Sequence, residues 1–237
     1  MTAGPSLTAE QLREAVDHAI TSRRSVRGFL PTPVDRATIE SILAVASRSP
    51  SGSNTQPWHV HVLTGSALQS MVAEIQAVYD DAEASAGHVQ DYAYYPVQWQ
   101  SPYIDRRRRN GWGLYALLDI EKGDHQRMRE LHRRNYQFFD APVGLFFSID
   151  RILERGSWLD FGMFLQSIMI AARGHGLDTC PQAAFNQYHR IISTRLGLPG
   201  SRMVVCGMAL GHADESRIEN TLVTERDPVA SFTTFLD

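Results

Sequence analysis

Three arginines flank one serine in the five residues from 23 to 27. They are Arg23, Arg24 and Arg27, and they stand around Ser25. A guanidinium group matches phosphate oxygens bidentately, and a serine hydroxyl with free backbone N–H groups completes such a site. The run therefore suits a phosphate-binding site, although taken alone these residues slightly favour a solvated polar turn.

A second polar string, from Ser49 to Trp58, consists mainly of small and turn-forming residues. Small residues such as Gly52 let a backbone approach a ligand closely. Asn54 and Gln56 offer amide donors and acceptors. The string suits contact with a planar heteroaromatic ring that carries imide edges, and an ordinary turn between a helix and a strand is the alternative.

Together the two strings resemble those of the flavin-dependent nitroreductase family. The resemblance continues through residues 176–185 and 205–211 to Arg226, two residues before Pro228, so it covers almost the whole chain in the family's order. It implies an α+β fold: a three-layer α/β/α sandwich with a mainly antiparallel central sheet. It also implies a homodimer with FMN at the subunit interface.

The family resemblance further implies an oxidoreductase that takes a hydride from NADPH or NADH. Such an enzyme reduces nitroaromatic or quinone-like acceptors in a ping-pong cycle, and FMN carries the chemistry, so no catalytic side chain is expected. Two other functions stay open. One is another flavin reaction on the same scaffold, reductive dehalogenation or flavin fragmentation. The other is a flavin-binding storage or sensor protein without enzymatic activity.

The same resemblance assigns cofactor-binding roles to individual residues. The residues that match the contacts to the phosphate and ribityl chain are Arg23, Arg24, Ser25, Arg27 and Arg226. The residues that match the loop supplied to the flavin by the partner subunit are Pro50, Ser51, Gly52 and Asn54, with Gln56 added to the site. The residues that match the segment along the flavin's reactive edge are Pro181, Gln182, Ala183 and Ala184, and the predicted long helix meets the ring at Asp160 and Met163.

The chain departs from the family pattern at three places. Gln182 and Ala183 stand in a segment where many relatives carry a glutamate, which changes the charge near the flavin. Thr224 stands where some relatives place a lysine. The segment 79–134 is long and aromatic, and it resembles a nitrobenzoate-reductase-like subgroup.

Segment 79–134 holds the weaker candidates for contact with substrate or NADPH. Tyr94 and Trp99 belong to an aromatic cluster that is expected either to pack or to form a lid over the flavin. Arg106 and Arg107 begin a run of four arginines that could bind the 2′-phosphate of NADPH or an anionic substrate. A solvated helix face is the default interpretation of this run.

Three further patterns carry little weight. The string 111–116 resembles a truncated dinucleotide fingerprint, but it does not follow an apolar strand. His59 and His61 could form a metal pair, yet no further ligand lies at a recognisable spacing, so no metal is expected. Cys180 could sense redox state, although such a cysteine is more often a small buried hydrophobic residue.

The elements that must position these residues follow from periodicity and capping. A capping box at Thr8 and an N-cap near Asp35 predict two helices, the second ending before Pro50. Further helices are predicted at 158–173, buried nearly all round, and at 186–196. Strands are predicted at 59–64, 141–149, 178–183 and 203–210. Segment 79–134 is expected to be partly helical and partly loop, inside a single domain that spans residues 1–237.

The composition limits the classes of protein to which the chain can belong. The 237 residues are 43% hydrophobic and 21% charged, which is ordinary for a globular chain. The formal net charge of −3 argues against a protein held to nucleic acid by bulk charge. Two cysteines cannot make a disulfide scaffold. No apolar run reaches membrane-spanning length and no secretory signal is visible, so a cytoplasmic protein without a membrane partner is expected.

Overall fold

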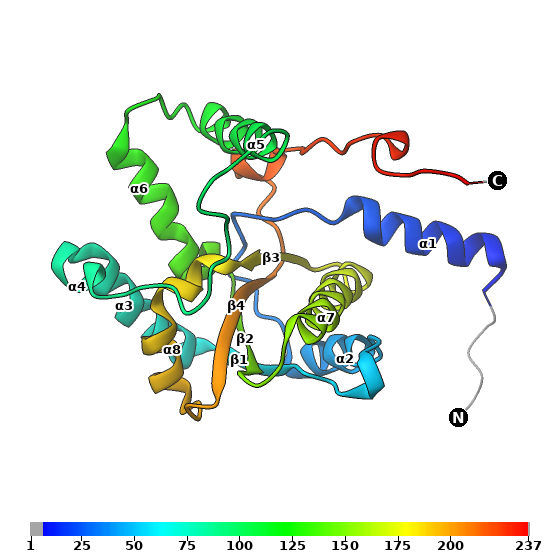
Figure 1. The fold of residues 1–237 in the computed structure, drawn as a ribbon, viewed down its shortest axis with the longest axis horizontal. Helices are drawn as coiled ribbons and strands as arrows, with labels where there is room; N and C mark the ends of the chain where they lie inside the picture. The colour runs from blue at the N-terminus through cyan, green and yellow to red at the C-terminus, as the bar shows by residue number, and fades with distance from the viewer. Residues whose placement is uncertain (1–6, 237) are drawn as a thin grey trace.

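The computed structural model describes residues 7–236 as a β-sheet with helices on both faces (Figure 1). The sheet has the strand order β1-β2-β4-β3, and every pairing is antiparallel. The strands are β1 (His59–Thr64), β2 (Val143–Asp150), β3 (Asp178–Gln182) and β4 (Arg202–Gly211). The α-helices are α1 (Ala9–Ser22), α2 (Arg36–Ala46), α3 (Gly65–Asp80), α4 (Ala82–Ala86), α5 (Tyr103–Leu117), α6 (His125–Arg133), α7 (Arg155–Gly174) and α8 (His189–Leu196). The 3₁₀ turns are η1 (Gly52–Asn54), η2 (Arg134–Asp140), η3 (Ala183–Tyr188), η4 (Ile218–Thr221) and η5 (Val229–Ser231).

The interior strand β2 is apolar from Val143 to Phe147 because both of its faces are covered. Leu145 and Phe147 belong to the core that α2 and α7 form on one face. Phe146 belongs to the core that α3 and α8 form on the other face. Figure 1 shows these helix pairs on opposite sides of the sheet. The predicted α+β class and three-layer α/β/α sandwich are therefore confirmed.

The predicted helix starts are confirmed by their capping bonds. The Thr8 hydroxyl accepts a hydrogen bond from the Gln11 backbone N–H at 3.1 Å, and the Gln11 side chain accepts one from the Thr8 backbone at 3.0 Å. Asp35 accepts from the Thr38 backbone N–H at 2.8 Å. Each cap satisfies N–H groups that the first helical turn leaves without partners.

Two helix predictions are wrong in detail. The helix expected from residue 186 begins at His189, because residues 183–188 form η3 and bury Phe185 and Tyr188 beneath it. Helix α7 is not buried all round. Its side chains Leu159 and Met163 are 73% and 40% exposed in the single chain, while the opposite stripe faces the core. Apolar residues therefore lie on two faces of α7: one face is buried in the core, and the other is exposed in the single chain.

Helix α1 projects from the body and has no buried residue (Figure 1). Leu12, Val16 and Ile20 follow one another at four-residue spacing and are about half exposed. The chain after η4 projects in the same direction, above α1 in Figure 1. A stripe of this kind normally packs against another element, so both projecting segments present unpartnered apolar surface.

Segment 79–134 contains α4, α5 and α6, with irregular chain between α4 and α5, as the sequence predicted. The string 111–116 lies inside α5, so it is not the strand-to-helix turn of a dinucleotide fingerprint. Within residues 7–236, no helix has the length and apolar character needed to cross a membrane.

Candidate functional site

The arginine-rich segment 23–27 lies directly beside β3. Ser25 pairs with Thr179 in a parallel bridge, and the Val26 backbone N–H donates to the Thr179 carbonyl at 3.1 Å. Val26 is fully buried and fixes the segment against the core. The structure thus brings the segment that begins at Arg23 next to the strand that ends at Gln182. These are two groups of predicted site residues separated by about 150 positions in the sequence.

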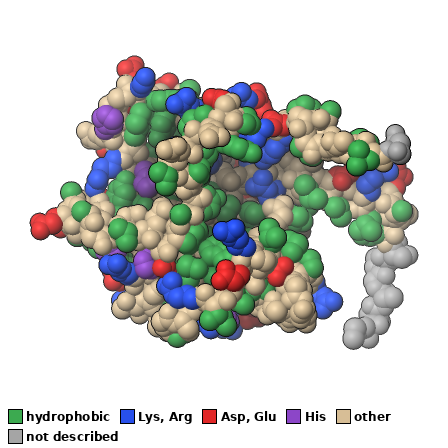
Figure 2. Space-filling view, in the orientation of Figure 1, with side chains coloured by type: hydrophobic (Ala, Val, Ile, Leu, Met, Phe, Trp, Pro, Cys, Tyr) green, Lys and Arg blue, Asp and Glu red, His purple; other side chains and the backbone are tan. Residues whose placement is uncertain are grey.

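Arg23 and Arg27 supply positive charge at this junction without a carboxylate partner among the described residues. The only hydrogen bond that the Arg27 guanidinium makes there is to the Ser25 carbonyl, at 3.2 Å. Arg24 differs, since it pairs with Glu215 at 3.3 Å. Figure 2 shows basic side chains in the hollow between α1 and the C-terminal segment. Unpaired guanidinium groups beside a serine fit the phosphate of FMN.

Cys180 sits next to these arginines and is buried in the core. Burial raises the pKa of its thiol to about 11, against the opposing effect of the Arg27 and Arg23 charges. The thiolate is the reactive form of cysteine. Cys180 therefore stays protonated near neutral pH and packs as a small hydrophobic residue rather than acting as a redox sensor.

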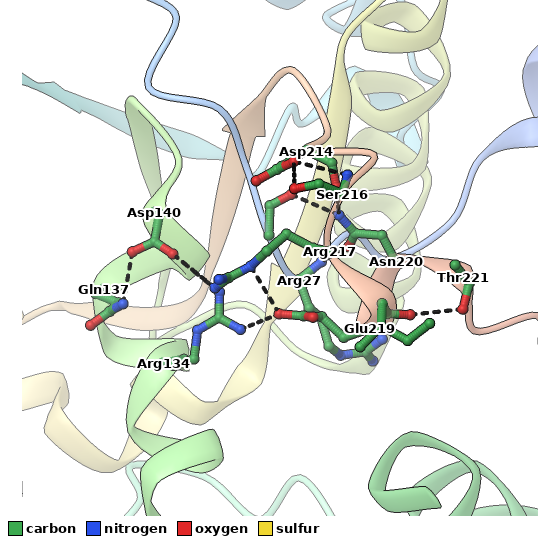
Figure 3. A network of polar contacts seen from close by, with 12 residues as sticks. Arg27, Arg134, Gln137, Asp140, Asp214, Ser216, Arg217, Glu219, Asn220 and Thr221 are labelled. Carbon is green, nitrogen blue, oxygen red and sulfur yellow. Dashed lines mark hydrogen bonds and ion pairs between the residues drawn. The ribbon is translucent and has the colours of Figure 1, made fainter. Parts of the chain in front are cut away.

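Asn220, from η4, holds the arginine segment from the other side (Figure 3). Its side-chain oxygen accepts from the Arg27 backbone N–H at 2.7 Å, and its side-chain nitrogen donates to the Gly28 carbonyl at 2.8 Å. Gly28 has no room for a side chain, because a Cβ there would lie 2.7 Å from Cγ of Arg217. Nothing in the poorly periodic C-terminal segment predicts that Asn220 contacts residues so far away in the chain.

The residue before Asn220 anchors η4 to the body (Figure 3). The Glu219 carboxylate is 5% exposed and bonds to the guanidinium of Arg134 and, at 3.3 Å, to Nε of Arg217. Arg134 also bonds to Asp140 at 3.1 Å. Burial pushes the pKa of Glu219 upwards, but its backbone hydrogen bond and Arg134 outweigh that effect, so the net pKa is lowered.

The loop 49–56 packs against α7. The Gly52 backbone N–H donates to Oδ2 of Asp160 at 3.1 Å, and the Ser49 hydroxyl contacts the Met163 carbonyl at 3.5 Å. Asn54 and Gln56 have φ of 57° and 48°. Left-handed backbone at non-glycine residues costs energy and is concentrated at ligand sites. The structure therefore joins the two predicted α7 residues to the predicted loop and supports a ligand contact there.

The loop and the arginine segment do not meet within one chain. No hydrogen bond or ion pair in the described part of the structure links residues 50–56 to residues 23–27 or 181–184. The predicted site residues thus form two groups, one around β3 and one around the N-terminal half of α7.

Gln182 ends β3 and is almost fully buried. Its amide nitrogen donates to the Asn135 carbonyl at 2.7 Å. The side chain is therefore turned into the protein. Ala183 and Ala184 follow as the first residues of η3. The predicted segment 181–184 is consequently held rigidly by its own side chains, and it can offer a ligand its backbone and the Pro181 ring.

The arginines of α5 are bound mainly to the C-terminal segment. Arg106 pairs with Asp227, and Arg109 bonds to Glu225 at 2.6 Å. The Arg107 guanidinium lies over the Trp99 ring, 5.0 Å from its centroid. These contacts hold the aromatic insert against the C-terminal segment. They also pair two of the four arginines with carboxylates, which leaves those two less available to a phosphate.

Arg226 lies in the same C-terminal segment. Its guanidinium donates to the carbonyls of Thr224 and Glu225 and to the Thr224 hydroxyl, at 2.8–3.1 Å. No hydrogen bond connects it to residues 23–27 within residues 7–236. The structure therefore places this predicted phosphate contact outside the cluster formed by Arg23 and Arg27.

A cavity of about 560 Å³ lies beside the end of β3. Pro181, Gln182 and Ala183 form one wall. The N-terminal half of α7 and the insert residues Tyr92 and Tyr94 form the others. A larger cavity of about 1080 Å³, between α2 and α3, touches none of the predicted site residues. The smaller cavity therefore connects the aromatic insert with the predicted flavin edge.

Asn186 fixes the insert over this cavity. It is fully buried, its side-chain oxygen accepts from the Asp91 backbone N–H at 2.9 Å, and its side-chain nitrogen donates to the Tyr92 carbonyl at 2.8 Å. Tyr92 in turn donates from its hydroxyl to the Val205 carbonyl at 2.6 Å and packs edge-on against Trp158. Both polar atoms of the buried Asn186 side chain are hydrogen-bonded to the insert, and they thereby fix the position of Tyr92 in the cavity wall.

We expect Asn186→Ala to lower the free energy of unfolding by about 2–3 kcal/mol, because two backbone groups lose buried partners. Urea titration measures this change, and hydrogen exchange at the Asp91 amide should accelerate. Asn186→Asp is the control, since it keeps the acceptor for that amide but cannot donate to the Tyr92 carbonyl. Unchanged exchange in the alanine variant would contradict the anchoring role.

The geometry defines an α+β protein with two arginines, unpaired among the described residues, beside a strand and an aromatic-lined cavity near the end of that strand. The nitroreductase family model matches residues 20–212. A 4-nitrobenzoate reductase of Pseudomonas putida is 41% identical over 95% of this chain and 97% of its own. A nitrobenzene nitroreductase of Ectopseudomonas oleovorans is 40% identical over 93% of this chain and 96% of its own.

Solved structures of nitroreductases have the same fold as this chain. An FMN and NADPH-dependent nitroreductase NfnB from sphigopyxis sp. strain HMH is 35% identical, with a TM-score of 0.88 over 94% of this chain and 99% of that one. The chain belongs to the nitroreductase family. The family resemblance found in the sequence is therefore confirmed.

Proposed function

We propose that the protein is an FMN-dependent oxidoreductase that uses NADPH, or NADH, to reduce nitroaromatic compounds. The observation that carries this proposal is the cluster of Arg23 and Arg27 beside β3, which has no carboxylate partner among the described residues. In a chain of this family, such a cluster suits the phosphate of FMN. The similarity to nitroreductases over nearly the whole chain supports the reaction.

Each part of the site has a proposed task. Segment 23–27 binds the phosphate and ribityl chain, with Arg226 as a further cation, and segment 181–184 lies along the flavin ring. The loop 50–56, braced by Asp160, contacts the flavin of the partner subunit. When bound, FMN supplies the electron transfer between NAD(P)H and the acceptor. The reduction takes two steps. In the first, the nitro group gains two electrons and two protons and loses water to give a nitroso group. In the second, the nitroso group gains two electrons and two protons to give a hydroxylamine.

We also propose a homodimer. The exposed apolar stripe of α1 and the exposed Leu159 and Met163 of α7 support it, since contiguous apolar surface marks an interface. The loop 50–56 would then reach the second subunit's site. Analytical ultracentrifugation tests this directly, because a monomeric holoenzyme at micromolar concentration would exclude a site shared between subunits.

The chain is further proposed to be one cytoplasmic domain. Contacts between residues near both ends, such as Arg27 with Asn220, support a single cooperative unit. Both cysteines are free and buried, which suits a reducing compartment. A single unfolding transition in urea and recovery in the soluble cell fraction are the expected results, and two separated transitions would contradict the single domain.

The absorption spectrum of the purified protein tests the flavin proposal. We expect bound FMN, bleaching by NADPH without oxygen, and conversion of a nitroarene to its hydroxylamine. Protein that stays colourless with added FMN would exclude every flavin function. Bound FMN without oxidation of NADPH by any acceptor would instead support a storage or sensor protein. Loss of halide or breakdown of the flavin in place of nitro reduction would indicate the other flavin reactions.

A further inference from the structure

The cavity beside β3 is lined mainly by apolar and aromatic residues, with Gln182 as a polar residue and one charged residue. Aromatic rings come from the insert and from α7, with Tyr92 and Trp158 packed edge-on at 4.8 Å between ring centroids. The one charged lining residue among those that the structure describes is Arg155. No carboxylate lines the cavity there. Its composition therefore favours an aromatic ligand and, in addition, a negative charge.

Arg155 is available to such a ligand. It makes no ion pair and no side-chain hydrogen bond with any residue between 7 and 236. The carboxylate of Asp160, on the same helix, bonds to the Gly52 backbone N–H of the loop 49–56 and makes no ion pair with Arg155 in the described part of the chain. Arg155 is also the first residue of α7, where the positive end of the helix dipole adds to its charge.

The opposite wall of the cavity is the segment 181–183. The proposed function places this segment along the flavin ring, so an acceptor in the cavity would have one end near the flavin. Between Arg155 and Leu165, which both line the cavity, α7 rises about 15 Å at 1.5 Å per residue. A single substituted benzene ring can therefore lie between the aromatic walls with its two ends in different surroundings.

We propose that this cavity is the acceptor subsite and that Arg155 selects nitroarenes carrying an anionic substituent, such as a carboxylate. The inference rests on the proposed function. The guanidinium group pairs with the carboxylate bidentately, the rings of Tyr92 and Trp158 hold the benzene ring, and the nitro group faces segment 181–183. Arg155 thus determines specificity and takes no part in the electron transfer.

Equilibrium binding to the oxidised holoenzyme, without NADPH, separates charge recognition from turnover. The probes are 4-nitrobenzoate and its neutral analogue 4-nitrobenzamide, followed by calorimetry. We expect wild-type protein to prefer the acid by at least about tenfold. Arg155→Ala should weaken binding of the acid about 10–100-fold, the effect of a hydrogen bond to a charged group, and leave the amide unchanged. Arg155→Lys should keep part of the preference, since it keeps the charge but not the fork.

Arg36→Ala is the matched control, because it removes the same charge from an exposed pair with Glu40 on α2 and should change neither affinity. Equal binding of acid and amide by wild type, or equal losses for both in Arg155→Ala, would overturn the inference. A raised KM for NADPH with unchanged acid binding would also overturn it, by assigning the charge to the coenzyme. Failure of wild-type holoenzyme to reduce either compound would refute the proposed function instead.

Discussion

Arg27→Ala is expected to raise the dissociation constant of FMN about 10–100-fold, the usual effect of losing a charge-assisted hydrogen bond to an ionised group. Arg27 is held on both sides, by the bridge of Ser25 to β3 and by the Asn220 side chain. Its guanidinium is therefore positioned before a ligand arrives, and little ordering entropy is lost on binding. Fluorescence titration of apoprotein with FMN measures the change.

Neighbouring variants make this test specific. Arg23→Ala should behave like Arg27→Ala, because neither side chain has a carboxylate partner among residues 7–236. Arg24→Ala should have a smaller effect, since Glu215 already neutralises that charge at 3.3 Å. Arg226→Ala should also have a smaller effect than Arg27→Ala, since its guanidinium already bonds to Thr224 and to the Glu225 carbonyl. Equal FMN affinity in wild type, Arg23→Ala and Arg27→Ala would remove the phosphate site from this segment.

Local signals predicted most of the fold. The two helix starts at Thr8 and Asp35 could be predicted because a capping side chain bonds to a backbone N–H only three residues further along the chain. The strand at 59–64 followed from the alternation of polar and apolar residues, and the other strands from short, mainly apolar runs. The start of α8 could not be found this way, because residues 183–188 have helical composition but wind as 3₁₀ turns to bury Phe185. Packing against the core determined that outcome.

The resemblance led to the segments of the candidate site, whereas residues that act through long-range contacts were missed. Segments 23–27 and 181–184 lie together as expected. Asn220 and Glu219 carried no signal, since the contacts that matter here, Asn220 to Arg27 and Glu219 to Arg134, join residues 193 and 85 positions apart and exist only in the folded chain. Arg155 could not be predicted as a site residue either. Its proposed role depends on the cavity that it lines and on its having no ion-pair partner among the described residues.

Glu219→Gln is expected to lower the free energy of unfolding by about 3 kcal/mol at pH 7. The carboxylate is 5% exposed, and the Arg134 side chain that it contacts is 18% exposed. Removing one partner of a buried pair leaves the other charge uncompensated, which costs about 3–5 kcal/mol. Asp140 still contacts Arg134 at 3.1 Å, which places the effect at the lower end. Urea unfolding measures the loss, and Glu215→Gln, at an exposed pair, is the control with a small effect.

The pH dependence identifies the charge as the cause. The pKa of Glu219 is lowered in the folded protein from its ordinary value of 4.5, so the folded state holds the carboxylate ionised more strongly than the unfolded state does. The stability that it contributes is complete above about pH 4.5 and is lost as the pH falls through the folded pKa. The gap between wild type and Glu219→Gln should therefore be largest at neutral pH and shrink below pH 4.5. A gap that stays constant with pH would mean that shape rather than charge is responsible.

The same variant should also weaken FMN binding, although Glu219 is not one of the proposed FMN contacts. Its neighbour Asn220 holds the backbone on both sides of the Arg27 peptide, and η4 keeps its place through the ion pairs of Glu219. Loosening η4 would return Arg27 to many conformations and restore the entropic cost of binding. We expect a several-fold rise in the FMN dissociation constant for Glu219→Gln and none for Glu40→Gln, which removes a carboxylate from an exposed pair with Arg36 on α2. FMN affinity that is unchanged in a clearly destabilised Glu219→Gln would show that the arginine segment is positioned by β3 alone.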